Sequence, residues 1–345
     1  MGSVGVWAAV LFYLHNPVGS GRQAPAPQPS SGVSRWVRVQ AATIATRYRW
    51  IENSEDTTIA NQLQYSGAFR AALLFDPQAR FRLVAGVATG SAFTSGWNAT
   101  GIGTGGVNDA VNLKHLYLWA MPLNGLEASY GSLEPARGEA TEVTTFDNDG
   151  YVFGGRVSVR KREWLFVDEA SVTVGHVGDL LRPGVFDRTR RYDSTNYQQY
   201  LVRRQFGRVA ISGEYSRLNG APTLRQALRV SAPELRVVDS LRFEQYEGLD
   251  DGGAYGFLVY AEKAVTRRIS AGGGFADIDP AYGILNADRF SRGRRAYAII
   301  SARLARGLTL QPFVTYAFAN DFPVSNRTRL DIVLSYDMLA AFGRP

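Results

Sequence analysis

In the strand-like segments of this 345-residue sequence, many basic side chains fall in one of the two alternating sets of residues. A period of two places successive side chains on opposite faces of a β-strand, and here one set is apolar while the other carries the charges. Twelve basic residues share the charged set: Arg70, Arg82, Lys114, Arg156, Arg160, Arg225, Arg229, Arg236, Arg242, Arg295, Arg303 and Arg329. Arginine is a permanently charged fork of donors that suits carboxylate and phosphate. A surface lined by these residues would attract anions.

Acidic residues with the same parity are fewer, namely Glu127, Glu169, Glu214, Glu244, Glu262, Asp331 and Asp337. The surplus of cations predicts a positive surface. Arg229 and Arg236 flank the "SAPE" turn and are expected on neighbouring strands, where like charges need water, an acid or an anion between them. For any single arginine the alternative stays open that it pairs with an acid or a carbonyl on the same face and packs the wall.

Other patterns that carry chemistry are weak. "GIGTGG" at 101–106 lacks the strand before it and the helix after it that a nucleotide fingerprint needs. His115 and His176 lie on separate strands without the partners of a helical zinc site, and nothing singles out Ser171 as a nucleophile beside either. "DNDG" and "GLDDGG" are typical of plain turns, although such clusters can bind calcium. Cysteine is absent. We expect no enzyme, no metal and no cofactor.

The stretch from Leu63 to Gly90 shows the elements that must hold these charges. Leu63, Phe69 and Phe75 alternate with Gln64 and Arg70, "DPQA" breaks the chain, and the alternation then restarts. This pattern predicts two strands joined by a tight turn. The sequence contains no apolar run of the roughly 18 residues that a membrane-spanning helix needs.

From Trp36 onward the sequence gives strand signals almost throughout. We expect sixteen strands, at 35–50, 62–75, 80–92, 111–121, 125–133, 150–161, 164–176, 195–205, 208–218, 223–231, 234–247, 254–265, 269–277, 294–305, 307–319 and 328–342. Short connections such as "DPQA" and "QFG" alternate with long ones such as "TSGWNATGIGTGGVNDA". A soluble sandwich has no reason for this alternation, whereas an outer-membrane barrel has short periplasmic turns and long external loops. The predicted fold class is all-β, a transmembrane antiparallel up-and-down β-barrel of about sixteen strands.

The end of the chain, "RLDIVLSYDMLAAF", places Leu330, Ile332, Leu334, Tyr336, Met338, Ala340 and Phe342 on one face. It resembles the closing strand of outer-membrane proteins, although "GRP" follows the aromatic residue at which such strands normally stop. With the alternating connections, the chain over 35–342 resembles a bacterial outer-membrane porin in architecture. No porin motif is matched, since the third long loop lacks a "PEFGG"-like segment.

The resemblance implies that the third long loop folds into a pore, and this loop carries Glu134, Glu139, Glu142, Asp147 and Asp149. It would then form an acidic constriction facing the basic wall; the alternative is a solvated external loop. The apolar parity would face lipid, because a charge at the bilayer midplane costs about 2–4 kcal/mol. Asp168 and Asp239 break this rule, and 35–50 and 195–205 do not separate cleanly. Bulges, rim positions, a subunit interface or a wrong register would explain them.

The N-terminus suggests export. Val4 to Leu14 is an apolar stretch of signal-peptide length without a basic residue before it, and Val18, Gly19 and Ser20 offer a cleavage site. We expect a signal peptide at 1–22, a Pro/Ser-rich linker at 23–34 and an outer-membrane β-barrel at 35–345. The net charge of +7 could indicate nucleic-acid binding, but the arginines are spread through strands rather than clustered, so no nucleic acid is expected.

The sequence therefore predicts a passive channel in the bacterial outer membrane for small hydrophilic solutes, with a preference for anions. Its partners would be outer-membrane lipid and small anionic or hydrophilic solutes, and a homotrimer is implied only by the porin resemblance. Two alternatives stay open: a substrate-specific channel for an acidic oligosaccharide or phosphate, and an outer-membrane enzyme or soluble all-β binding protein.

Overall fold

A computed structural model describes residues 35–342 apart from 94, 141–149, 162–163, 165, 180, 190–193, 251–252, 280–292 and 319–326. The expected signal peptide and linker lie outside the described residues, as do Glu142, Asp147 and Asp149. No helix among the described residues is long and apolar enough to cross a membrane.

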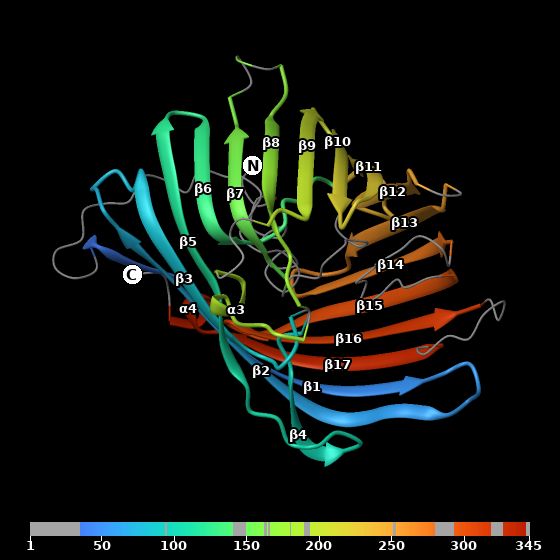
Figure 1. Cartoon of the computed structure of the whole chain (residues 1–345). Helices are drawn as coiled ribbons and strands as arrows, with labels where there is room; N and C mark the ends of the chain where they lie inside the picture. The colour runs from blue at the N-terminus through green and yellow to red at the C-terminus, as the bar shows by residue number, and fades with distance from the viewer. Residues whose placement is uncertain are drawn as a thin grey trace.

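The described chain is a closed antiparallel barrel of sixteen strands (Figure 1). The strands are β1 (Val37–Glu52), β2 (Thr58–Leu74), β3 (Phe81–Thr89), β5 (Val111–Leu123), β6 (Leu126–Leu133), β7 (Val152–Val159), β8 (Glu169–His176), β9 (Tyr197–Phe206), β10 (Val209–Leu218), β11 (Ala221–Ser231), β12 (Ser240–Gly248), β13 (Tyr255–Ala264), β14 (Ile269–Ile278), β15 (Gly293–Ala305), β16 (Leu308–Ala317) and β17 (Thr328–Asp337). Each pairs with its neighbours in sequence, and β1 pairs with β17 to close the ring. The predicted fold class is confirmed.

Three short elements lie outside the ring. β4 (Asn98–Gly103) is a strand in the connection between β3 and β5, and it pairs with the loop end of β2. It contains the start of "GIGTGG", and no helix follows it. α3 (Phe186–Thr189) lies in the connection between β8 and β9. α4 (Met338–Phe342) follows β17, so the expectation of a strand to 342 is wrong at its end. Asp337 explains the stop, because its carboxylate accepts the Ala340 amide at 3.0 Å as a helix cap.

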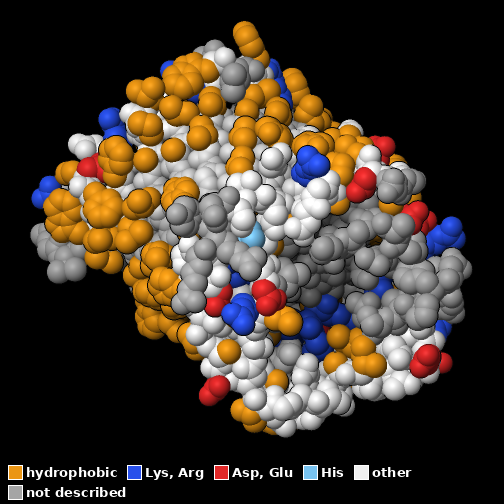
Figure 2. Space-filling model, in the orientation of Figure 1, with side chains coloured by type: hydrophobic (Ala, Val, Ile, Leu, Met, Phe, Trp, Pro, Cys, Tyr) orange, Lys and Arg blue, Asp and Glu red, His pale blue; other side chains and the backbone are white. Residues whose placement is uncertain are grey.

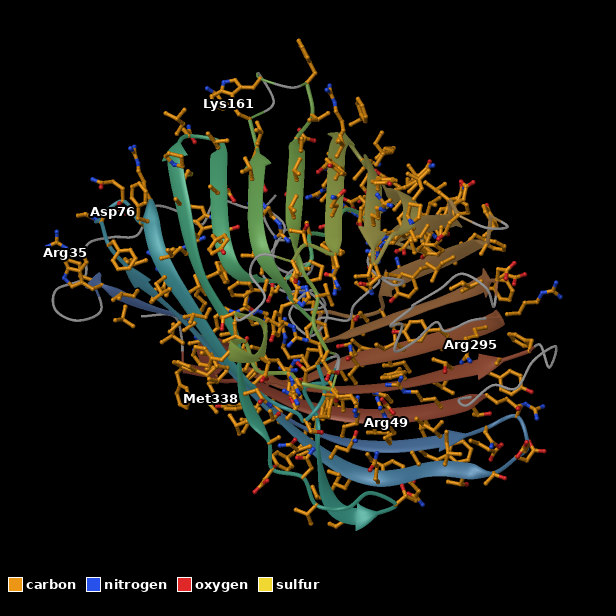
Figure 3. The ribbon with its side chains drawn as sticks, in the orientation of Figure 1. Arg35, Arg49, Asp76, Lys161, Arg295 and Met338 are labelled. Carbon is orange, nitrogen blue, oxygen red and sulfur yellow. The ribbon has the colours of Figure 1, made fainter. Side chains whose placement is uncertain are left out.

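Short turns gather at one end of the barrel and most of the longer connections at the other, as the sequence predicts. Two connections at the short-turn rim are longer than expected. The β7–β8 connection runs to Asp168, since Phe166 adopts a left-handed conformation that a strand does not allow. The β11–β12 connection spans 232–239. Figure 3 places Asp76 and Lys161 beyond the strand ends at this rim.

Burial in this barrel is inverted relative to a soluble protein. Large hydrophobic side chains such as Phe69, Phe243 and Ile300 are exposed on the outer face, and charged ones such as Lys114, Arg295 and Asp331 are buried on the inner face. Figure 2 shows hydrophobic side chains gathered over the outside and basic ones in the central hollow. The hairpin of β2 and β3 follows the expected parity, with Phe69 outward and Arg70 inward.

Aromatic residues are not confined to the outer face, which corrects the sequence-based sorting. Tyr260, Tyr297 and Phe313 are buried on the inner parity of β13, β15 and β16. Their ring centroids lie 5.9 Å and 6.1 Å apart in that order. The Arg329 guanidinium lies 5.0 Å from the Phe313 ring centre, which is close enough for a cation–π interaction.

Candidate functional site: a charged inner wall and a docked loop

Most of the twelve predicted basic residues lie on the inner wall. Those within strands on the inner parity are Arg70, Arg82, Lys114, Arg156, Arg225, Arg229, Arg242, Arg295, Arg303 and Arg329. Arg160 follows β7 directly and bonds to two inner glutamates. Figure 3 shows Arg295 and the unpredicted Arg49 on their strands.

Arg236 is the exception. It lies exposed in the 232–239 connection, outside the strands, so its predicted place opposite Arg229 is wrong. The residue opposite Arg229 is Arg242, six positions later, because β12 begins only at Ser240. The expected pair of facing arginines therefore exists, but with Arg242 as the second member.

Several inner arginines pair with inner acids. This is the alternative described above, in which an arginine packs the wall instead of facing a solute. Arg225 bonds to Glu214, and both side chains are buried. Arg160 joins Glu127 at 2.9 Å and Glu169 at 3.0 Å. These pairs link neighbouring strands and leave little charge for a solute.

The closing seam holds a denser cluster. Asp331 on β17 is fully buried and accepts from Arg49 at 2.8 Å and from Arg329 at 2.6 Å, and Arg47 lies 3.5 Å away. Arg47 also donates to Gln64 at 2.6 Å and lies 4.0 Å from the Trp97 ring centre. One carboxylate thus sits among three guanidinium groups where the first and last strands meet.

Sequence reasoning missed Arg47 and Arg49 because a β-bulge interrupts β1. The pairing with β2 shifts between Val39 and Ala41, so the residues that face outward change from odd to even numbers there. It missed Arg203 on β9 for another reason. The inner parity of that strand includes the buried Tyr197 and Leu201, so polarity does not separate its two faces.

Asp168 and Asp239, which broke the predicted sorting, are rim residues. Each lies just before a strand at the short-turn end, and each carboxylate accepts a backbone amide from the next strand, Gln205 at 2.5 Å and Ala264 at 2.7 Å respectively. Asp239 also pairs with Lys263 at 2.8 Å. At the rim these carboxylates do not meet the middle of the outer face.

The third long loop turns into the barrel directly after β6. Glu134 bonds to Arg70 on β2, its carboxylate lies 3.8 Å from His115 on β5, and its carbonyl accepts from Arg156 on β7. Burial opposes the charge of Glu134, but the nearby Arg70 and His115 outweigh it and hold the pKa of Glu134 below its ordinary value. This end of the loop is therefore anchored as a carboxylate.

Glu139 anchors the loop on the other side of the wall. Its carboxylate accepts from Arg203 at 2.7 Å and from Arg229 at 2.6 Å. Burial disfavours its charge, yet the hydrogen bond from Arg229 and the charge of Arg203 lower the pKa of Glu139 from its ordinary value. An acid from the loop thus lies beside Arg229, the arginine that faces Arg242 in the strand register.

The backbone between these two anchors lies flat on the wall. The Ala136 carbonyl accepts a hydrogen bond from the side-chain amide of Gln199 at 2.7 Å. The backbone amide of Glu139 donates to the Ser212 hydroxyl at 2.7 Å. A side chain at Gly138 would come within 2.4 Å of the Ser212 Cβ, so only glycine permits this approach. The described part of the third loop thus crosses the inner wall from β2 to β11.

Other candidate chemistry has no support among the described residues. No group of three or more His, Asp or Glu side chains there could hold a metal ion. His115 lies beside Glu134, His176 lies 3.3 Å from Ser194, and the buried Ser171 hydroxyl has no hydrogen-bond partner in this part of the chain.

Solved structures that are similar to this chain include porins. Salmonella typhi OmpF, in a complex with daunomycin, covers 87% of this chain and 97% of its own, with a TM-score of 0.58 and 10% identity. An engineered Rhodopseudomonas blastica porin covers 87% of this chain and 100% of its own, with a TM-score of 0.56 and 11% identity.

This chain is a porin-like β-barrel. No protein-family model matches it, and no curated protein matches it by sequence. The likeness is therefore one of fold.

Proposed function

We propose that this porin-like barrel is a passive diffusion channel of the bacterial outer membrane. The observation that carries the proposal is the inverted burial, with a belt of exposed apolar side chains around a ring whose inner face is charged. Among β-structures, only a closed barrel with such a belt satisfies its backbone hydrogen bonds in lipid while keeping polar side chains in water. The short-turn rim would then be periplasmic and the long-loop rim external.

We further propose that small hydrophilic solutes pass and that anions are preferred. The inner wall has three basic residues beyond the predicted set, Arg47, Arg49 and Arg203. It lacks Arg236, which lies in a turn. It also lacks the predicted acid Asp337, which caps a helix. Cations remain in surplus among the described inner residues even after Glu134 and Glu139 are included. Attraction spread over many sites lets an anion enter and still leave.

In this proposal the third loop narrows the channel. Glu134 and Glu139 are held by Arg70, Arg203 and Arg229, so each acid neutralises cations that would otherwise attract solute. Arg242, which lies opposite Arg229 in the strand register, has Glu244 4.0 Å away. Trimeric assembly stays an expectation from the porin likeness.

A planar-bilayer recording in a KCl gradient tests the proposal. Stepwise conductance with a reversal potential that favours chloride is the expected result. A monodisperse protein in buffer without detergent would contradict the membrane barrel, and an insertion that conducts no ions would contradict the channel. Conduction with a preference for potassium would leave the channel standing and remove the anion preference.

A further inference from the structure

One fully buried arginine joins three connections at the long-loop end of the barrel. Arg188 lies in α3, in the connection between β8 and β9. Its guanidinium donates to the Tyr151 hydroxyl at 2.9 Å and to the carbonyls of Asp179 and Arg182 at 2.8 Å and 2.5 Å. It also lies 4.4 Å from the ring centre of Phe93 and 4.7 Å from that of Tyr151. Phe93 belongs to the β3–β5 connection and Tyr151 to the third long loop, just before β7.

The bonds around Arg188 form a closely packed set. The Tyr151 hydroxyl accepts from Arg188 and donates to the Pro183 carbonyl at 2.9 Å, so it links two points of the β8–β9 connection. A side chain at Gly178 would come within 3.1 Å of the Arg188 Cγ. Arginine supplies both a plane that stacks on rings and a fork of donors, whereas lysine has neither.

The joined connections cover part of the inner wall. Val152 on β7 and Tyr197 on β9 have the inner parity of their strands, yet they are only 0% and 1% exposed. Both belong to a buried cluster that includes Phe93, which follows β3. From the other direction, the backbone amide of Val185 in the β8–β9 connection donates to the Leu113 carbonyl on β5 at 2.9 Å. The described parts of these connections therefore reach over the wall from β5 to β9.

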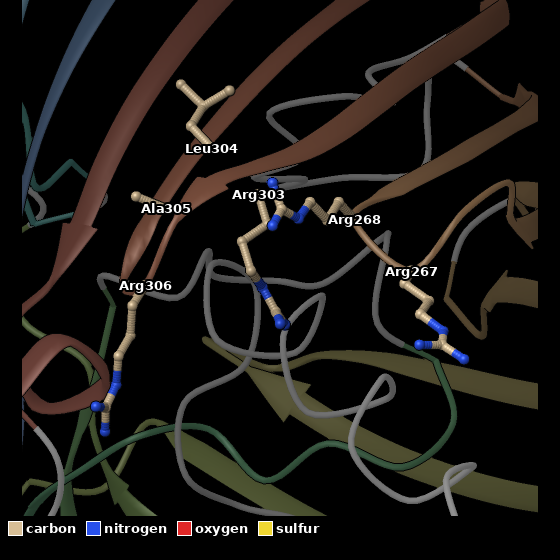
Figure 4. A pocket seen from close by; sticks show the side chains of 6 residues that line it. All are labelled: Arg267, Arg268, Arg303, Leu304, Ala305 and Arg306. Carbon is tan, nitrogen blue, oxygen red and sulfur yellow. The ribbon is translucent and has the colours of Figure 1, made fainter.

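Arg188 differs from arginines at the short-turn rim. Arg267 and Arg306, which border a shallow depression there, are exposed, and their guanidinium groups point away from each other (Figure 4). The hydrogen-bond partners of Arg188 in the described chain are neutral oxygens instead. Burial of a charge among neutral partners costs free energy, so packing alone does not favour arginine at this position.

We propose that Arg188 is a positioning residue that holds these connections over the inner wall and so limits the size of solute that enters at the long-loop end. The inference rests on the proposed channel function. Without the bonds of Arg188 the connections would separate, and the inner wall of β7 and β9 would become accessible to solute.

Swelling of lipid vesicles that contain the full-length protein tests the size limit. Glucose, sucrose and raffinose are uncharged, so their entry does not report the charge of the wall. R188A and Y151F should both raise the rate of raffinose entry relative to glucose, since Y151F keeps the ring but removes both bonds of the hydroxyl. R188K should raise it less than R188A, because lysine keeps the charge and can still donate to a carbonyl.

The matched control is R182A, in the same connection, because the Arg182 side chain is exposed and its partner Asp179 is exposed as well. Its ratio of raffinose to glucose entry should equal that of the wild type. An unchanged or lower ratio in both R188A and Y151F, or an equal rise in R182A, would overturn the proposal.

A thiol at position 152 reports the covered wall without any transport, since the chain has no cysteine of its own. The thiol of V152C should resist a polar thiol reagent, and adding R188A or Y151F should make it reactive while circular dichroism shows unchanged strand content. A thiol that stays unreactive in both backgrounds would overturn the role of Arg188 even in a conducting barrel. A thiol that becomes reactive in a barrel that admits no glucose would support that role and contradict the channel function alone.

Discussion

At the scale of single residues, the inner arginines differ in how closely they lie to an acid. Arg225 is bonded to Glu214 and both are buried, so the pair acts as packing. Arg242 lies 4.0 Å from Glu244 and directly opposite Arg229 on the neighbouring strand. The register therefore places two arginines opposite each other, with Glu139 beside Arg229 and Glu244 near Arg242.

Replacing Arg229 and Arg242 together with glutamine should reduce chloride selectivity. Two fixed cations would disappear, and Glu139 would lose one of its two arginine partners and become a less compensated anion. The measurement is the reversal potential in a KCl gradient. R236Q is the matched control, since Arg236 is exposed in a turn, and its reversal potential should equal that of the wild type. Equal effects of the two changes would contradict the assignment.

Acid should increase the anion preference. The pKa values of Glu134 and Glu139 are lowered in the folded state, so their contribution to loop docking is complete above the ordinary glutamate pKa of about 4.3. It is lost as the pH falls through the lowered folded values. Protonation removes two negative charges from the wall, and chloride selectivity should rise below about pH 4.

The variant E139Q tests whether the acid in the third loop, rather than another acid, causes this pH dependence. At neutral pH it should already show part of the low-pH selectivity, and acid should change it less than the wild type. E234Q serves as control, because Glu234 is exposed at the rim with Arg208 as its partner. If E139Q keeps the wild-type reversal potential at pH 7, the loop does not control selectivity.

At the scale of elements, strand parity decides what each face meets. On β2, Phe69 is exposed on the outside, and the next residue, Arg70, bonds to the docked loop inside. A slip of one residue would move all of these side chains to the wrong face. Since the chain has no cysteine, single cysteines can report this directly.

Arg70→Cys should react with a membrane-impermeant charged thiol reagent, while Phe69→Cys should not when the protein is in a bilayer. Leu73→Cys, also outward on β2, is a control that should resemble Phe69→Cys. In detergent solution, where the belt is less well sealed, the difference should shrink. Reaction at 69 but not at 70 in the bilayer would show that the register is shifted.

Parity and connection length were enough to predict the sixteen-stranded barrel and most of its inner basic residues. They failed where local backbone geometry intervenes. The bulge after Val39 hid Arg47 and Arg49, and the long turn before Ser240 misplaced Arg236. The partners of Glu134 and Glu139 were beyond prediction, because Arg70 and Arg229 lie 64 and 90 positions away along the chain.

The seam between β1 and β17 should be especially sensitive to one substitution. Asp331 is fully buried among Arg47, Arg49 and Arg329, so Asp331→Asn leaves three cations without their acid. Removing one partner of a buried pair costs about 3–5 kcal/mol. Urea unfolding in lipid vesicles should show a clear loss of stability.

Asp277→Asn is the matched control, because Asp277 pairs with Arg294 at 3.1 Å near the loop rim and both side chains are exposed. Exposed pairs contribute about 0–1 kcal/mol, so this variant should unfold close to the wild type. Similar unfolding midpoints for D331N and D277N would mean that water in the lumen already screens Asp331.

At the scale of the whole molecule, charges fixed on a ring of strands produce one continuous field. A narrow lumen with walls of low dielectric constant concentrates that field, so a modest surplus of cations can bias which ion enters. Dissolved ions screen the charges of the wall and so weaken this bias.

Chloride selectivity should therefore fall as the salt concentration rises. The screening length is about 10 Å at 0.1 M and about 3 Å at 1 M, so the charges of the wall arginines act over a longer distance in dilute salt. Reversal potentials at a constant concentration ratio, measured over this range, test the expectation. A selectivity that does not change with salt would indicate discrimination by pore size rather than by charge.

The pairing of β1 with β17 also determines when the barrel can form. Arg49 and Asp331 are 282 positions apart, so the bond that closes the ring joins segments that are far apart in the chain. Contacts so distant in sequence make folding slow. Until β17 is present, β1 and β16 each have an open edge that could pair with another chain and aggregate. A chain in which β17 has not yet paired with β1 therefore has to stay apart from its copies if it is not to aggregate.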